Sequence, residues 1–134
     1  MKKLTAIILM VLIVVGVTFA TISDSEYRNL TRRPDSVTKQ YWDIDGEVIQ
    51  WFDASDEGYD MYRINTKMES WGYSGNTVLV VIFDTYDFPK LMEGDIVHLT
   101  GLLYRGPYTY NSVLAANITI PWFQNVEDSG GLFE

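Results

Sequence analysis

The sequence contains no cysteine and only one histidine among its 134 residues. The lack of cysteine excludes disulfides, thiolate metal sites, a cysteine nucleophile and a lipid-modified cysteine anchor. The lone histidine, His98, alternates with Val97 and Leu99 in an expected strand, which indicates a side chain on one sheet face rather than a catalytic base or a metal ligand. We therefore expect no enzyme activity and no tightly held cofactor.

Basic residues are also scarce, because 10 Lys and Arg stand against 18 Asp and Glu, a formal net charge of −8. Residues 37–134 carry five cations and fifteen acids, a net charge of −10. Nucleic-acid binding depends on neutralising phosphates, so this composition argues against a nucleic-acid partner. The content of 47% hydrophobic and 21% charged residues is that of a globular chain, and the length suits one domain.

One long hydrophobic run lies near the N-terminus. Residues 4–22, LTAIILMVLIVVGVTFATI, contain no charge and follow Lys2 and Lys3. A helix of this length rises roughly 30 Å, enough to cross a bilayer. We expect residues 1–22 to form a hydrophobic helix, either a transmembrane anchor or a signal peptide with a weak cleavage site at Ala20. Both alternatives place the rest outside the cytoplasm, anchored to the membrane or released as a secreted or periplasmic domain.

Three further segments differ in composition. Residues 23–39 are polar, contain Pro34 and lack apolar periodicity, which predicts a linker. Residues 40–123 consist of short β-rich runs separated by Gly, Asp, Asn and Pro, which predicts an all-β domain. Residues 124–134 predict an acidic flexible tail.

The β domain divides into five expected strands. Apolar residues alternate along 42–48 in the first, and the acids between them, Asp43, Asp45 and Glu47, should form a solvated face. Gly46 marks a bulge or sharp bend in this strand. The third strand is apolar on both faces and should be central and buried. The expected strands are residues 41–53, 59–70, 77–84, 96–104 and 112–120, with turns at 53–58, 71–76 and 105–111 and a longer connection at 85–95.

Three short patterns in this domain resemble a known fold. Gly94–Gly101 reads Gly-Asp-x-Val-x-apolar-x-Gly, Asp45–Val48 reads x-Gly-x-Val, and Leu114–Ile118 resembles a closing strand. Over residues 37–123 the chain resembles the oligonucleotide/oligosaccharide-binding (OB) fold, and most nearly the small exported bacterial tRNA-anticodon-binding-like OB proteins. The resemblance implies a five-stranded Greek-key barrel. The alternative, an immunoglobulin-like sandwich, usually needs about seven strands.

An acidic turn is the candidate metal site. Asp53, Asp56 and Asp60 cluster there and are the possible ligands of a weak calcium site. An EF-hand starting at Asp53 fails, because its twelfth position is Ile64, where a bidentate glutamate is required. A solvated turn is the simpler alternative.

Aromatic residues supply the candidate binding surface, since Trp, Tyr and Phe make up 14% of the chain. Tyr59, Arg105, Tyr108 and Tyr110 fall in expected loops that flank the binding face of the resembled fold. They suit stacking on sugars or anchoring a protein partner; alternatively, they cap the open ends of a small barrel. We predict a non-catalytic, envelope-exposed module that binds another protein. The alternatives are a structural subunit of a membrane or virion assembly, and a carbohydrate- or calcium-binding module.

Overall fold

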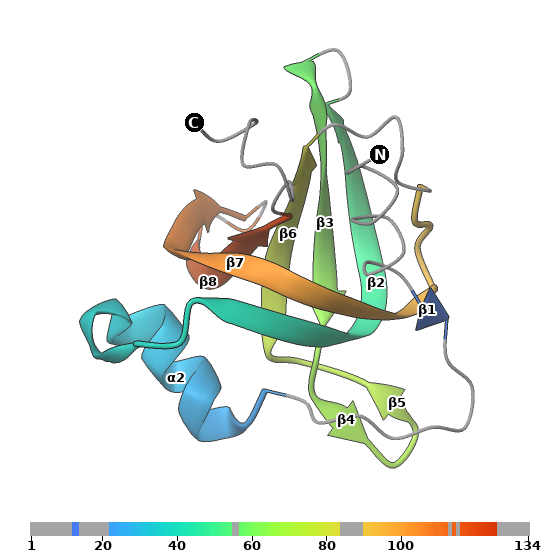
Figure 1. Cartoon of the computed structure of the whole chain (residues 1–134). Helices are drawn as coiled ribbons and strands as arrows, with labels where there is room; N and C mark the ends of the chain where they lie inside the picture. The colour runs from blue at the N-terminus through green and yellow to red at the C-terminus, as the bar shows by residue number, and fades with distance from the viewer. Residues whose placement is uncertain are drawn as a thin grey trace.

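The chain folds mainly into β-strands, as the sequence predicts (Figure 1). The computed structural model describes residues 12–13, 22–54, 57–83, 90–112, 114 and 116–125. In chain order the elements are β1 (Leu12–Ile13), α2 (Asp24–Arg32), a 3-10 turn (Pro34–Ser36), β2 (Tyr41–Ala54), β3 (Tyr59–Asn65), β4 (Met68–Glu69), β5 (Gly72–Tyr73), β6 (Thr77–Phe83), β7 (Ile96–Asn111) and β8 (Asn117–Gln124).

Six of the strands form one sheet in the order β1-β7-β2-β3-β6-β8, and β7 also pairs with β8. Each of the five long strands therefore lies between two others. The pairs are antiparallel except β6–β8, which is parallel. β4 and β5 make a separate two-stranded hairpin. The expected second strand, 59–70, is thus split, since β3 ends at Asn65 and the next residues turn into that hairpin.

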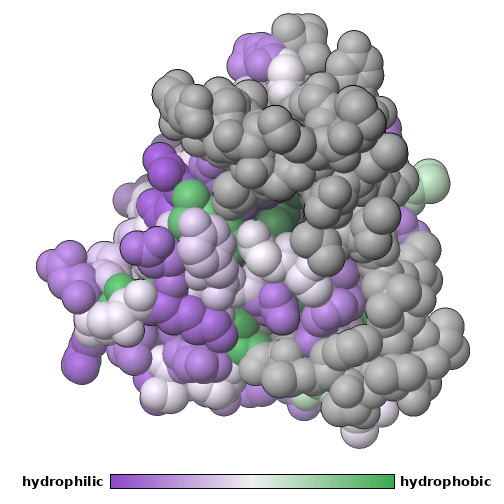
Figure 2. Space-filling model, in the orientation of Figure 1, coloured by the Kyte–Doolittle hydropathy of each residue, from purple (hydrophilic) through white to green (hydrophobic). Residues whose placement is uncertain are grey.

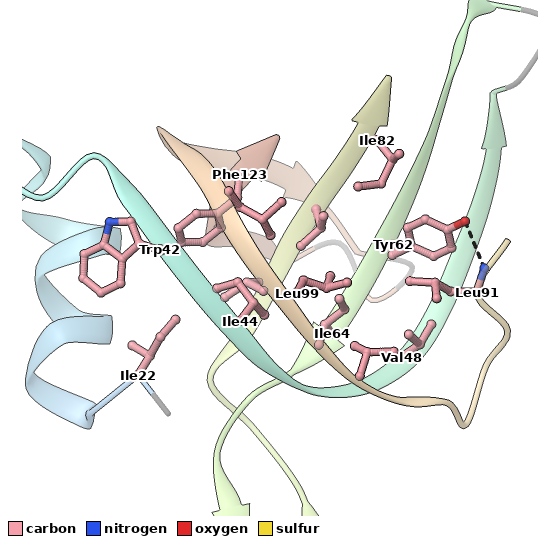
Figure 3. Packing of buried hydrophobic residues seen from close by; sticks show 14 of the residues in the cluster. Ile22, Trp42, Ile44, Val48, Tyr62, Ile64, Ile82, Leu91, Leu99 and Phe123 are labelled. Atoms are coloured by element: carbon pink, nitrogen blue, oxygen red, sulfur yellow. Dashed lines mark hydrogen bonds between the residues drawn. The ribbon is translucent and has the colours of Figure 1, made fainter. Parts of the chain in front are cut away.

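The main hydrophobic core lies between the long strands (Figure 3). Period-two alternation buries Trp42, Ile44 and Val48 of β2, as predicted. Tyr62 is 2% exposed, and its hydroxyl accepts a hydrogen bond from the backbone N–H of Leu91 at 3.3 Å, so its polar end is satisfied within the core. The remaining members of this core are Ile22, Leu30, Ile64, Val78, Val80, Ile82, Leu91, Val97, Leu99, Leu102 and Phe123.

The first long strand curves, but not through a bulge at Gly46. Register shifts fall on either side of that residue, between Trp42 and Ile44 and between Val48 and Gln50. Gly46 meets a different requirement, because β3 passes so close that a Cβ there would lie 2.2 Å from the carbonyl oxygen of Asn65. Glycine is needed at this position for close backbone approach.

The expectation of a linker at 23–39 is wrong for its first half, which forms α2. Ser23 and Glu26 make a reciprocal capping box: the Ser23 hydroxyl accepts from the Glu26 N–H at 3.1 Å, and Glu26 accepts from the Ser23 N–H at 2.9 Å. Leu30 is fully buried, and the Tyr104 hydroxyl donates to its carbonyl oxygen at 2.5 Å. Because Leu30 is the one buried residue of this nine-residue helix, the sequence shows no apolar periodicity that would have predicted it. The face shown in Figure 2 is mostly hydrophilic around α2.

The residues of the expected turn at 105–111 belong to strand β7, and β8 continues beyond Pro121 to Gln124. Pro107 and Pro121 are register partners in the β7–β8 ladder. Proline has no backbone N–H, so the two residues that cannot donate to the ladder lie opposite each other. β8 pairs with β6 only from Trp122 onward, which leaves Pro121 with β7 as its neighbour. Long-range pairing therefore overrides a local Gly-Pro turn signal.

Both ends of the chain lie partly outside the described residues. The expected N-terminal hydrophobic helix falls on residues 1–22, of which Leu12–Ile13 are described as a strand paired with β7. Within the described part of the chain, no helix is long and apolar enough to cross a membrane. At the other end, Gln124 closes β8 and Asn125 directly follows it, and both are buried rather than part of a tail. The rest of the expected tail, 126–134, lies outside the described residues.

Candidate functional site

An apolar groove lies between the outer face of the sheet and the β7–β8 hairpin. We call it the aromatic groove. It comprises two adjoining hollows of about 170 and 350 Å³. Its lining residues are Phe52, Tyr59, Met61, Arg63, Leu79, Val81, Phe83, Tyr108, Tyr110, Ile120 and Trp122.

The groove exists because β6 is apolar on both faces. Val78, Val80 and Ile82 point into the main core, whereas Leu79 and Val81 belong to a second cluster on the opposite face. Successive residues of a strand alternate between faces, so a run such as TVLVVIF requires cover on both sides. On the outer side the cover comes from Tyr59, Met61, Phe83, Tyr110, Ile118, Ile120 and Trp122.

Two aromatic pairs form part of the groove wall. The rings of Tyr108 and Tyr110 stack with centroids 6.1 Å apart and planes inclined by 24°. The rings of Tyr59 and Phe83 are tilted by 52° with centroids 5.6 Å apart. Tyr108 is 46% exposed, so much of its ring remains available to a ligand. Such rigid rings offer large contact area with little loss of conformational entropy.

Two arginines adjoin the groove and give it a local positive charge in an acidic protein. The Arg63 guanidinium lies 5.8 Å from the ring centroid of Tyr110, and that of Arg105 lies 5.8 Å from the ring of Trp122. Arg63 also donates from Nη1 to Gln50 Oε1 at 2.8 Å. Arg63 Nε and the Tyr110 hydroxyl are buried with no hydrogen-bond partner among the described residues. Both can donate to an acceptor brought by a ligand.

The structure brings the four residues of the predicted binding surface around this groove, but not in loops. Tyr59 begins β3, while Arg105, Tyr108 and Tyr110 all lie within β7. Arg105 sits where the register with β8 shifts, between Tyr104 and Gly106. The sequence interpretation missed Met61, Leu79, Val81 and Trp122; the two-sided apolar pattern of β6 was the available signal for a second apolar surface.

The predicted calcium ligands do not form a common site in the described structure. Asp60 is 1% exposed rather than on an acidic turn, and Lys90 Nζ lies 3.4 Å from its Oδ2. Asp56 and the side chain of Asp53 lie outside the described residues. Within the described ranges, no group of three or more His, Asp or Glu side chains is placed to hold a metal ion.

The predicted solvated acidic face of β2 is wrong at Asp45, which is 2% exposed and contacts His98 Nδ1 through Oδ1. The two residues are register partners on β2 and β7, so the contact is a cross-strand pair. Burial raises the pKa of Asp45, and the His98 contact opposes that shift. Asp43 remains exposed, and its Oδ1 accepts from the Gly101 N–H at 3.1 Å. These contacts tie β2 to β7.

Comparison with protein-family models, curated proteins and solved structures finds no significant match to this chain.

Proposed function

We propose that this protein is a non-catalytic binding module that engages another protein through the aromatic groove. The observation that carries the proposal is the exposed ring of Tyr108 above an apolar floor that includes Leu79. Apolar surface left open at one place on a small domain is typical of an interaction site. Aromatic and arginine side chains dominate the energetics of such sites.

We further propose that the five long strands form a Greek-key barrel of the OB type. Two features support this: β7 pairs with both β2 and β8, so the order of pairings returns to its start, and the one parallel pair is β6–β8. In that fold, ligands bind on the barrel surface and its flanking loops. Here the open surface is the outer side of β3 and β6, beneath the β7–β8 hairpin.

We place the module at the cell envelope. The uncharged run at 4–22 after Lys2 and Lys3 supports export or anchoring. An exported module meets protein partners on the envelope rather than cellular nucleic acid, which agrees with its acidic composition.

Site-directed photo-cross-linking in cells that express the chain natively tests this function. A photo-reactive amino acid replaces Tyr108 in one variant and Tyr41 in the other; Tyr41 is 54% exposed and lies outside the groove lining. We expect a discrete protein adduct from position 108 that is absent from position 41. Identical adducts from both positions, or none from position 108, would refute the assignment.

A matched pair of substitutions measures the contribution of the groove. Tyr108→Ala should weaken binding of the cross-linked partner about thirtyfold, because interface hot spots contribute about 2 kcal/mol or more. Tyr41→Ala should leave the affinity unchanged. The urea midpoints of both variants identify any loss caused by unfolding. Equal affinity of the Tyr108→Ala variant and the wild type would exclude the groove as the binding surface.

A further inference from the structure

The chain leaves the sheet directly beside the aromatic groove. The side-chain amide of Asn125 accepts from the Phe83 N–H at 2.8 Å and donates to the Phe83 carbonyl oxygen at 2.9 Å. The Asn125 N–H also donates to the carbonyl oxygen of Val81 at 3.3 Å. Val81 and Phe83 both line the groove, so the described part of the chain ends at its wall.

The sequence that follows complements the groove chemically. Residues 126–134 read VEDSGGLFE, with Leu132 and Phe133 as an apolar pair and three acids around them. The groove offers an apolar floor and the guanidinium groups of Arg63 and Arg105. Large apolar side chains suit the floor, and carboxylates suit the arginines and the unpaired Tyr110 hydroxyl.

The segment is also long enough to fill the groove. Leu132 lies seven positions after Asn125, an extended reach of about 23 Å. Leu79 and Phe83, which both line the groove, are four residues apart on β6, about 13 Å along the strand. The apolar pair can therefore reach any part of the groove floor from its anchor.

We propose that segment 126–134 occupies the aromatic groove of its own chain, with Leu132 and Phe133 on the apolar floor and its acids toward Arg63 and Arg105. This inference rests on the proposed function, because the same groove then receives the partner. Attachment at Asn125 gives the segment an effective concentration on the order of 1 mM, so a protein partner must displace it. Segment 126–134 and the protein partner thus compete for the same groove.

A fluorescent peptide of sequence VEDSGGLFE, followed by anisotropy, tests the inference. We expect it to bind a full chain carrying Leu132→Ala and Phe133→Ala about tenfold more tightly than the wild type, because the attached segment competes. This magnitude assumes a peptide Kd on the order of 100 µM against the effective concentration above. Adding Tyr108→Ala to that chain should abolish binding, whereas adding Tyr41→Ala should not.

Three results would overturn the inference: no peptide binding to the Leu132→Ala/Phe133→Ala chain, equal binding to the wild type, or equal binding after Tyr108→Ala. A dimer in the wild type that dissociates in the Leu132→Ala/Phe133→Ala chain would assign the segment to a second copy and overturn the intramolecular version. The peptide assay contains no partner protein. Its failure is therefore distinguishable from failure of the cross-linking test, which reports on the proposed function alone.

Discussion

Replacing Gly46 by alanine should strongly destabilise the fold, although propensity alone predicts the opposite. In a strand interior, alanine is favoured over glycine by about 0.5–1 kcal/mol. At Gly46, however, the added Cβ would lie 2.2 Å from the Asn65 carbonyl oxygen and 2.7 Å from Ile64 Cγ2. The nearer atom is backbone in the β2–β3 ladder, where Glu47 and Asn65 are register partners, so it cannot move without disturbing the pairing.

The contacts set the expected magnitude. Overpacking a well-packed site costs about 1–3 kcal/mol, and a clash with paired backbone belongs at the upper end. We therefore expect Gly46→Ala to lower the free energy of unfolding by about 3 kcal/mol. With a urea m-value of about 1–3 kcal/mol/M, the midpoint should fall by about 1–3 M.

Gly101→Ala is the matched control in the same sheet. Gly101 has φ +67°, and a Cβ there would meet nothing within 4 Å, so only left-handed backbone strain opposes alanine. That strain costs about 1 kcal/mol. Urea unfolding followed by tryptophan fluorescence compares both variants with the wild type. A Gly46→Ala midpoint no lower than that of Gly101→Ala would refute the argument from close backbone approach.

Three further outcomes are expected from urea unfolding. Ser23→Ala removes the capping box of α2 and should cost about 1 kcal/mol, whereas exposed Ser25→Ala should cost less than half as much; equal effects would contradict the capping role. Leu30→Ala should cost about 2–5 kcal/mol, and Leu114→Ala, 85% exposed, should cost almost nothing. Burial raises the pKa of Asp45 above its ordinary value of 3.8. At pH values between 3.8 and this raised pKa, the folded state binds more protons than the unfolded state. The stability of the wild type relative to Asp45→Asn should therefore fall as the pH rises through that window, and an increase would contradict the assignment.

Strands whose own residues show a clear hydrophobic pattern are predictable from the sequence. The first and third expected strands, 41–53 and 77–84, match β2 and β6 within one residue. Their alternation and two-sided apolarity report directly on burial, which is a local property of each position. The capping box at Ser23 and Glu26 was equally visible, but a helix of nine residues offers too little periodicity to stand out from a polar linker.

Strand ends determined by distant partners are not predictable in this way. Arg105-Gly106-Pro107 is a strong local turn signal, yet these residues continue β7. The reason is the pairing of Pro107 with Pro121, a residue fourteen positions along the chain that the local pattern does not include. The same limit explains Asp45: its burial depends on His98 of the neighbouring strand, whereas its own strand predicts a solvated acid.

The aromatic groove depends both on the local hydrophobic pattern of one strand and on long-range strand pairing. A strand such as β6, apolar on both faces, requires a second covering layer, and this requirement follows from its seven residues alone. Which residues provide the cover depends on the β7–β8 hairpin, whose path over Leu79 and Val81 is set by long-range pairing. Leu79 and Val81 are each only 5% exposed beneath this cover, whereas Tyr108 of the hairpin remains 46% exposed at the groove. The open apolar surface therefore belongs to the covering layer itself, at Tyr108, and this exposed ring is the physical reason to look for a ligand there.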